Sequence, residues 1–228
     1  MTTVLLVRHG RTAANASGVL AGWTPGVHLD ETGRGQAETV AQRLSGIPLK
    51  TIVASPLERT QQTAEVIAQA QITQRRSPVI EIDPDFGECD YGTWTGRELA
   101  KLRKKPMWQQ IQGHPSSVTF PEGESLIAMQ QRAVDAVRWW NRTIGPKGIY
   151  VVVSHGDVIK AIVADALGMH LDQFQRIAID PASVSIIEYT DMQPFVLRTN
   201  DSGEDLSFLR PHRRKKPSET VVGGGAGR

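Results

Sequence analysis

The chain has 228 residues, of which 39% are hydrophobic and 22% charged, the balance of an ordinary soluble globular protein. This length suits one substantial domain, with room for a small inserted cap. No apolar stretch reaches the roughly 18–20 residues of a membrane span, and no secretory signal is visible at the N-terminus. The lone cysteine, Cys89, excludes an intrachain disulfide and suits a reducing compartment, so we expect a cytoplasmic protein with no membrane partner.

The formal net charge of +2 belongs to the C-terminal tail rather than to the body of the chain. Residues 210–228 hold six Lys/Arg and one Glu, a net charge of +5, so the remaining 20 basic and 23 acidic residues give −3. The tail also contains prolines and a glycine run and has little to bury. We predict a single domain over residues 1–209 and a basic, glycine-rich, disordered tail over 210–228. A weak electrostatic handle for a partner is the alternative for the tail, although we expect no nucleic-acid partner.

In the first half of the chain, strands alternate with helices. Val4–Val7 is an apolar strand that ends on Arg8, His9 and Gly10, and residues 14–30 form a polar loop. Apolar positions at helical spacing predict a helix over residues 32–44, and residues 51–54 form a short buried strand. Ser55 and Pro56 then indicate a helix start, with serine at the N-cap and proline at the first helical position.

The second half continues this alternation after a strand at residues 79–82 and a glycine- and aromatic-rich loop at 85–96. Residues 98–122 show only a weak pattern and are the candidate cap insertion. A long helix over 122–144, a very hydrophobic strand at 149–154 and a helix over 158–167 follow, and residues 183–199 indicate an edge hairpin whose strands could pair between subunits of a homo-oligomer. We therefore predict an α/β fold, a three-layer α/β/α sandwich around a largely parallel sheet.

Polar side chains gather where these strands end. His9 and Arg8 follow the first strand, Arg59 lies in the first turn after the second, and His155 follows the strand at 149–154, while Glu88 lies in a nearby loop. Ligands of open α/β sheets bind at the carboxyl ends of the strands, so we expect these five side chains to meet there. Guanidinium groups and helix N-termini bind phosphate oxygens, an imidazole can attack phosphorus, and a carboxyl group can protonate a leaving alcohol.

Each of these residues also has an ordinary structural interpretation, as a hydrogen-bonded core histidine, a surface ion-pair partner or a turn cap. Their joint placement at several strand ends favours a site for a small phosphate ester. A metal is not expected, because the usual zinc-ligand spacings are missing and Arg8 beside His9 would repel a dication. We expect no cofactor, since arginines can supply the positive charge.

The motifs LLVRHGRTAAN, ASPLERTQQTAEVI, GECDYGTWTG and VVVSHGDVIKAIV, in this order, resemble the histidine phosphatase superfamily, also called the phosphoglycerate mutase-like family. The resemblance covers about residues 3–189 and is closest to the phosphatase branch. It implies that His9 becomes phosphohistidine, that Glu88 is the proton donor and then the base for water, and that Arg8, Arg59 and His155 clamp the phosphoryl oxygens. Further contacts are expected from Asn15 and the amide of Gly156.

Substrate identity should depend on the rim of the pocket, which we place at residues 17–24, 91–94 and 107–120. Trp23, Tyr91 and Trp94 in this rim could stack on the substrate or simply cover the sheet. Arg11 stands where the family usually has Glu or Gln, and it could favour an anionic substrate or pair with a carboxylate outside the pocket. The family contains both phosphatases and phosphomutases. The loop after Glu88 is similar to the phosphatase branch, so we expect a phosphomonoesterase acting on a small metabolite, with a phosphomutase or a catalytically idle phospholigand-binding module as alternatives.

Basic residues after this loop keep the phosphomutase alternative open, because they could hold a second phosphate. They are Lys101, Arg103, Lys104 and Lys105. A solvated helix face is the simpler interpretation of the same residues.

Overall fold

The computed structural model describes residues 1–72, 78–203 and 223. Within them, a six-stranded sheet has the order β3-β2-β4-β1-β5-β6. Its strands are β1 (Thr2–Arg8), β2 (Leu49–Ala54), β3 (Val79–Ile82), β4 (Ile149–Ser154), β5 (Val184–Tyr189) and β6 (Pro194–Asp201). The first four run parallel to one another, and β5 and β6 are antiparallel additions at one edge. The predicted three-layer α/β fold is confirmed, and the late hairpin forms that edge.

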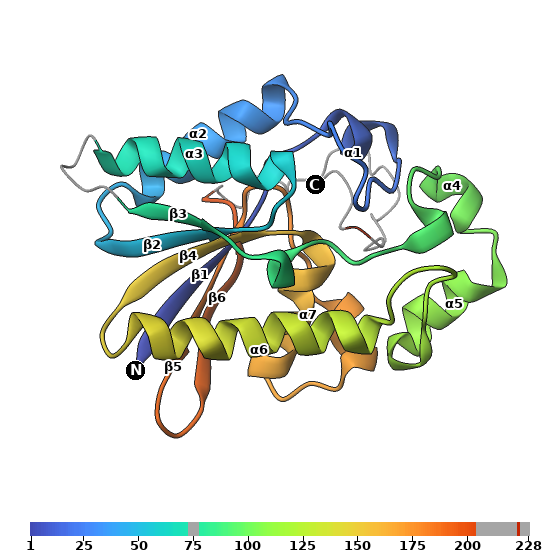
Figure 1. The fold of residues 1–228 in the computed structure, drawn as a ribbon. Helices are drawn as coiled ribbons and strands as arrows, with labels where there is room; N and C mark the ends of the chain where they lie inside the picture. Colours follow the sequence, from blue (N-terminus) through green and yellow to red (C-terminus); the bar gives the residue numbers. More distant parts are fainter. Residues whose placement is uncertain (73–77, 204–222, 224–228) are drawn as a thin grey trace, which may run out of the picture.

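Helices cover both faces of the sheet (Figure 1). On one face lie α2 (Glu31–Leu44) and α3 (Glu58–Ile72), and on the other α6 (Leu126–Ile144) and α7 (Gly156–Ala166). Alternate residues of a strand point to opposite faces, so Val4 and Leu6 of β1 pack with α6 and α7, while Leu5 and Val7 pack with α2 and α3. The central strands are buried on both sides, which explains their continuous apolar runs.

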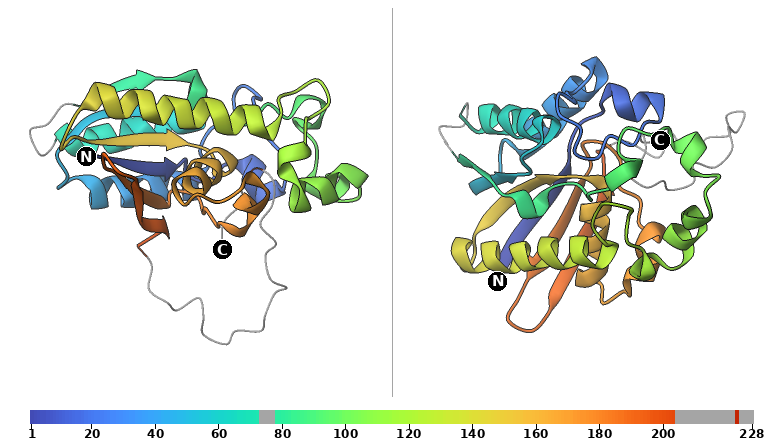
Figure 2. Two further views of the ribbon diagram at one scale, coloured as in Figure 1. Left: turned by 90° about the horizontal axis from the view of Figure 1, so that it is seen from below. Right: turned by 45° about the vertical axis from the view of Figure 1, so that its right-hand side comes forward.

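Shorter elements lie at the carboxyl end of the sheet. They are α1 (Ala13–Ser17), η1 (Pro84–Phe86), η2 (Gly92–Trp94), α4 (Leu99–Leu102), α5 (Pro106–Gly113), η3 (Pro115–Ser117) and η4 (Leu171–Arg176). Figure 2 shows α4 and α5 beside one end of the sheet. Leu102, Trp108 and Ile111 from this predicted cap segment are buried in the same core cluster as α6 and α7. The segment therefore packs directly on the main body.

Two local predictions were wrong. Residues 14–30 were predicted as loop, but α1 begins after Thr12, whose hydroxyl accepts from the Asn15 amide in a capping box. The third helix begins at Glu58, not at Ser55–Pro56, because its first i to i+4 backbone hydrogen bond runs from the Gln61 amide to the Leu57 carbonyl oxygen. Of the predicted tail, all but Gly223 lies outside the described residues.

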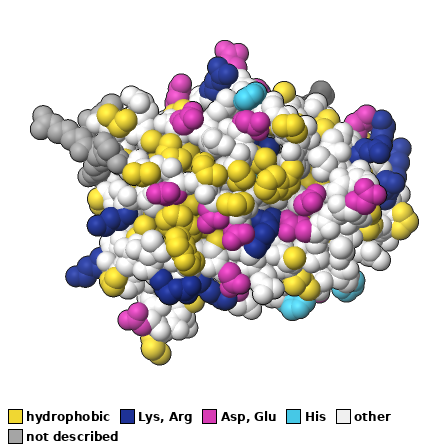
Figure 3. All heavy atoms as spheres, in the orientation of Figure 1, with side chains coloured by type: hydrophobic (Ala, Val, Ile, Leu, Met, Phe, Trp, Pro, Cys, Tyr) yellow, Lys and Arg dark blue, Asp and Glu magenta, His cyan; other side chains and the backbone are white. Residues whose placement is uncertain are grey.

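The outer strands of the sheet are β3 and β6. Hydrophobic side chains gather across the middle of the face that carries β3 (Figure 3), and Val79 and Ile82 of this strand are exposed. Homo-oligomer formation stays a prediction. No helix among the described residues is both long and apolar enough to cross a membrane.

Candidate active site

Arg8 is the last residue of β1, and its side chain is fully buried. Its Nη1 donates to the Ile179 carbonyl oxygen at 2.8 Å, and Nη2 donates to the Gly223 carbonyl oxygen at 3.3 Å. Burial lowers the pKa of Arg8 to about 10, against the opposing attraction of Glu88, Asp180 and Asp157. The guanidinium therefore keeps its charge at neutral pH, at the end of a core strand.

His9 follows Arg8 directly and is 3% exposed. Its Nδ1 lies 2.7 Å from the Gly10 carbonyl oxygen, which can only accept, so this nitrogen carries the hydrogen. Nε2 is left with its lone pair and accepts from Nε of Arg59 at 3.3 Å. Burial, followed by the charges of Arg59 and Arg8, holds the pKa of His9 well below its ordinary value. The ring is thus neutral, with a basic nitrogen facing Arg59.

Gly10 permits the close packing beneath this histidine. A Cβ atom at Gly10 would lie 2.3 Å from the carbonyl oxygen of Gly33 in the first turn of α2. Because backbone cannot yield as a flexible side chain does, only glycine fits here. The end of β1 is therefore held against α2, which fixes the backbone that carries His9.

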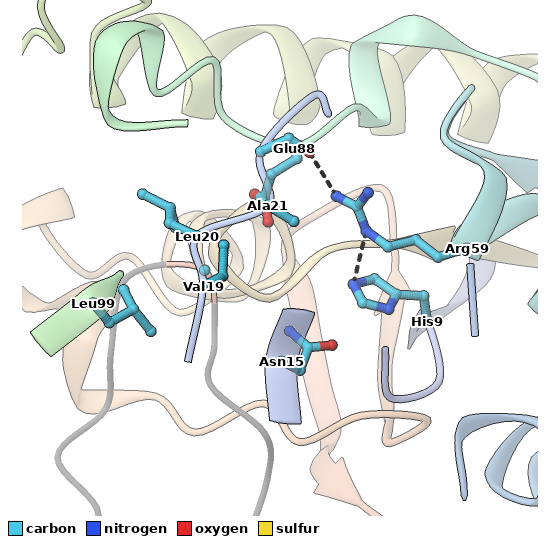
Figure 4. A pocket seen from close by; sticks show the side chains of 10 residues that line it. His9, Asn15, Val19, Leu20, Ala21, Arg59, Glu88 and Leu99 are labelled. Atoms are coloured by element: carbon cyan, nitrogen blue, oxygen red, sulfur yellow. Dashed lines mark hydrogen bonds between the residues drawn. The ribbon is translucent and has the colours of Figure 1, made fainter. Parts of the chain in front are cut away.

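Arg59 lies in the first turn of α3 and is 2% exposed. Its Nη2 donates to the Gly22 carbonyl oxygen at 2.9 Å and lies 3.3 Å from Nδ1 of His155. Figure 4 shows the guanidinium above the His9 ring. Its Nη1 is buried and has no hydrogen-bond partner among the described residues. A buried charged donor is costly when unpaired, so this nitrogen is suited to receive an anionic oxygen.

His155 is the N-cap residue of α7 and is fully buried, with its ring centroid 5.2 Å from that of His9. Its Nε2 lies 2.8 Å from the Ser55 hydroxyl. The same hydroxyl accepts from the Leu57 amide at 3.4 Å. Burial and the neighbouring arginines lower the pKa of His155, so this ring is neutral as well. Gly156 follows as the first residue of α7.

Glu88 lies in the loop between η1 and η2, and its side chain is buried. Its Oε1 accepts from the Cys89 amide at 3.0 Å, and Oε2 lies 4.0 Å from Nδ1 of His155. Burial and the negative charge of Asp157 raise the pKa of Glu88 to about 7, although Arg59 and Arg8 oppose the rise. The carboxyl group therefore exchanges a proton near neutral pH.

Two side chains from elsewhere hold the backbone of Glu88. The indole Nε1 of Trp23 donates to the Glu88 carbonyl oxygen at 2.6 Å, and Nη2 of Arg132 donates to the same oxygen at 3.1 Å. Arg132 also donates to the Gly87 carbonyl oxygen at 2.9 Å and pairs with Glu124. These contacts fix the position of the carboxyl group relative to His9.

A small, partly open cavity lies among these groups. Its lining residues are His9, Asn15, Val19, Leu20, Ala21, Gly22, Arg59, Glu88, Leu99 and Gly223. Three of the five central residues predicted from the sequence line it, and Arg8 and His155 lie behind them in direct contact with Gly223 and Arg59. Asn15 also lines the cavity, while its side-chain oxygen accepts from the Thr12 amide at 3.1 Å.

The other predicted rim residues lie outside this lining. Arg11 pairs with Asp30 at 2.8 Å, so the alternative of a carboxylate outside the pocket is the one the structure shows. Trp23 donates a hydrogen bond to the backbone of Glu88, and Trp94 is buried edge-on against Phe120. Tyr91 is fully buried, and its hydroxyl donates to Asp157 at 3.0 Å.

Residues 17–24 were predicted as part of the rim, and Leu20, Ala21 and Gly22 of this loop do line the cavity. Two other residues of the site were not anticipated. Arg132 lies on α6, and nothing in its helical spacing indicates its contact with the Glu88 loop. Asp157 was within the quoted motif VVVSHGDVIKAIV, two residues after His155, and that proximity was the one available signal.

The arrangement combines a neutral imidazole, two buried guanidinium groups and a carboxyl group that titrates near pH 7. Such a set can bind a dianionic phosphoryl group, offer it a nucleophile and supply a proton to a leaving oxygen. In the described part of the chain, no group of three or more His, Cys, Asp or Glu side chains is placed to hold a metal ion.

Comparison with known proteins agrees with this chemistry. Residues 4–202 match the model of the histidine phosphatase superfamily (branch 1). Phosphoserine phosphatase 1 of Hydrogenobacter thermophilus is 32% identical over 88% of this chain and 92% of its own length. A probable phosphoglycerate mutase of Cronobacter sakazakii is 32% identical over 83% of this chain and 86% of its own.

Among solved structures, YhfR of Bacillus stearothermophilus superimposes with a TM-score of 0.79 at 27% identity, covering 88% of this chain and 98% of that protein. Relatives thus carry the names of both phosphatases and phosphomutases. With the family model matching nearly the whole described body, the chain belongs to the histidine phosphatase superfamily, branch 1.

Proposed function

We propose that the protein is a phosphomonoesterase that hydrolyses a small phosphorylated metabolite through a phosphohistidine on His9. The observation that carries this proposal is the state of His9. Its Nδ1–H is fixed by the Gly10 carbonyl oxygen, and its Nε2 lone pair lies 3.3 Å from Nε of Arg59, beside the cavity. A neutral imidazole beside two cations cannot offset their charge, so it contributes little to stability, but it is a suitable nucleophile for an anionic substrate.

In the first step, Nε2 of His9 attacks phosphorus and the bond from phosphorus to the ester oxygen breaks. Glu88, protonated at and below about pH 7, gives its proton to that oxygen, and the alcohol leaves. Arg8 and Arg59 hold the charge on the phosphoryl oxygens, including the site offered by Nη1 of Arg59. In this way arginines supply the positive charge that the transfer needs.

In the second step, the Glu88 carboxylate takes a proton from water, whose oxygen attacks phosphorus. The bond from phosphorus to Nε2 breaks, phosphate leaves, and His9 returns to its neutral form with Nδ1 still protonated. One carboxyl group therefore serves both steps, and this requires a pKa near the working pH.

Hydrolysis, rather than phosphoryl return to a second ester, is supported by the surroundings of the cavity. A mutase must retain a ligand with a second phosphate. Of the four cations that could bind one, three line a separate cavity beside Trp94 that shares no residue with the cavity at His9: Lys101, Lys104 and Lys105. The fourth, Arg103, lies over the ring of Trp108 at 5.9 Å from its centroid. Phosphoserine phosphatase 1, one of the relatives above, is named for an activity of this type.

The test is a panel of phosphate esters with wild type, His9→Ala and His170→Ala. His170 is a control because its side chain is 68% exposed on another element, η4. We expect wild type and His170→Ala to release phosphate and alcohol in equal amounts and to form an acid-labile phosphoenzyme. His9→Ala should do neither, and substantial turnover by that variant would refute the mechanism. Isomerised ester without free phosphate would instead identify a mutase.

A further inference from the structure

Asp157 is a buried carboxylate that the mechanism above does not use. It lies in the first turn of α7, two residues after His155, and is fully buried. Its Oδ1 accepts from Nζ of Lys160 at 3.2 Å, and Lys160 also donates to Oε1 of Gln175 at 3.1 Å. Burying a charged pair is costly unless its hydrogen bonds are satisfied, and these two charges offset each other. If these two residues served only to fill the core, apolar residues in their place would pack as well.

The second oxygen of Asp157 contacts a residue of the cavity wall. Oδ2 accepts from the Tyr91 hydroxyl at 3.0 Å and from the amide of Gly223 at 3.0 Å. Gly223 lines the cavity together with His9, Arg59 and Glu88. A donor that took the place of the Gly223 amide at the cavity wall would therefore reach Oδ2.

The peptide groups of Gly223 show what this position accepts. Its amide donates to Asp157, while its carbonyl oxygen accepts from Arg8 at 3.3 Å. One short fragment thus spans a carboxylate and a guanidinium with a donor at one end and an acceptor at the other. In a phosphate ester, the phosphoryl oxygens supply the acceptor. The complementary donor must then lie on the alcohol portion, a few bonds from the ester oxygen.

We propose that Asp157 determines substrate specificity by accepting, at Oδ2, a hydrogen bond from a hydroxyl or ammonium group on the alcohol portion of the substrate. This inference rests on the proposed phosphomonoesterase function. The substrate class is then an amino- or hydroxy-alcohol phosphate rather than a plain alkyl or aryl phosphate. Sites built to accept a hydrogen bond reject analogues that lack the donor, because the buried acceptor is left unpaired.

The experiment compares three esters with similar leaving groups: propyl phosphate, glycerol 1-phosphate and O-phosphoethanolamine. The first has no donor on the alcohol portion, the second a hydroxyl and the third an ammonium group. We expect wild type to prefer at least one donor-bearing ester over propyl phosphate by about 10- to 100-fold in kcat/KM, the range for hydrogen bonds to charged groups. Asp157→Asn should remove most of a preference for ammonium but retain part of one for hydroxyl, since an amide oxygen still accepts.

A second variant removes the whole ion pair, in case Asp157→Asn leaves Lys160 uncompensated and does not fold. Asp157→Leu combined with Lys160→Met takes away both buried charges, a replacement that proteins often tolerate. It should abolish the preference for either donor. Asp165→Asn is the matched control, because Asp165 lies on the same helix, pairs with Arg138 and is 34% exposed. It should keep the wild-type ratio between the esters.

A preference that disappears with Asp157 and persists with Asp165→Asn supports the proposal. Equal losses on all three esters, or an unchanged ratio, would overturn it. If wild type hydrolysed neither these esters nor any ester of the panel above, the proposed function would fail instead. In that case, calorimetry can measure binding of the same three esters to His9→Ala and to His9→Ala combined with Asp157→Asn. The ratio of the affinities for donor-bearing esters and for propyl phosphate then tests the role of Asp157 without turnover.

Discussion

The raised pKa of Glu88 should make the stability of the protein depend on pH, and a single substitution, Glu88→Gln, tests this dependence. Glu88→Gln keeps the size and the accepting oxygen of the side chain but cannot ionise. Its oxygen still accepts from the Cys89 amide, the contact that Oε1 makes at 3.0 Å. The substitution therefore removes one buried titrating group with little other change.

The expected magnitude follows from the two pKa values. In the unfolded chain the carboxyl group ionises at its ordinary value of 4.5, whereas in the folded protein burial and Asp157 raise the pKa to about 7. Below pH 4.5 the group is protonated in both states and costs nothing. As the pH rises, the unfolded chain loses the proton first, so the wild type loses stability until about pH 7. The total is about 3 kcal/mol, at about 1.4 kcal/mol for each pKa unit.

The assay is urea unfolding of both proteins at intervals from pH 5 to pH 8. The free energy of unfolding of Glu88→Gln minus that of wild type should increase by about 2–3 kcal/mol over this range. Glu38→Gln, at an exposed position of α2, controls for the loss of one surface carboxylate and should change stability by less than about 0.5 kcal/mol. A difference between Glu88→Gln and wild type that stays constant across the range would refute the raised pKa.

Further substitutions test the catalytic arrangement. Glu88→Gln should slow hydrolysis about 10²–10⁴-fold, and less for esters of good leaving groups such as aryl phosphates; an equal loss for all leaving groups would remove Glu88 from the acid role. Arg59→Lys should lower kcat/KM about 10²-fold in a phosphate-release assay, because a single ammonium cannot replace the fork that contacts His9, His155 and the phosphoryl group. Arg132→Gln should lower kcat about tenfold with little change in KM, because the Glu88 carbonyl oxygen loses its hydrogen bond from Arg132 and the Glu88 carboxyl group is less well positioned. Gly223→Val should lower KM two- to tenfold, because it should release Arg8 from the Gly223 carbonyl oxygen. A valine is strained at the φ of 76°, and its Cβ would lie 2.9 Å from Leu20, so the peptide should move away. An increase in KM would contradict this.

The sequence determined which residues gather at the site. The alternation of apolar strands with amphipathic helices predicted a parallel sheet, and the carboxyl ends of parallel strands meet at one edge. His9 and His155 each follow such a strand directly, and Arg59 lies in the first turn of the helix after β2, so their meeting follows from the topology. The motif order likewise predicted the family, which the match over residues 4–202 confirmed.

The tertiary structure decided what each of these groups does to the others. The Trp23 contact that fixes Glu88 spans 65 positions, and the contact of Arg59 with Gly22 spans 37. No local pattern encodes such separations, so the sequence could not show which side chains surround Glu88 or why its pKa rises. For the same reason Arg11 was a candidate for substrate contact until Asp30, 19 positions away, proved to be its partner. Periodicity encodes where a strand ends, whereas burial and charge at that end depend on segments that only folding brings together.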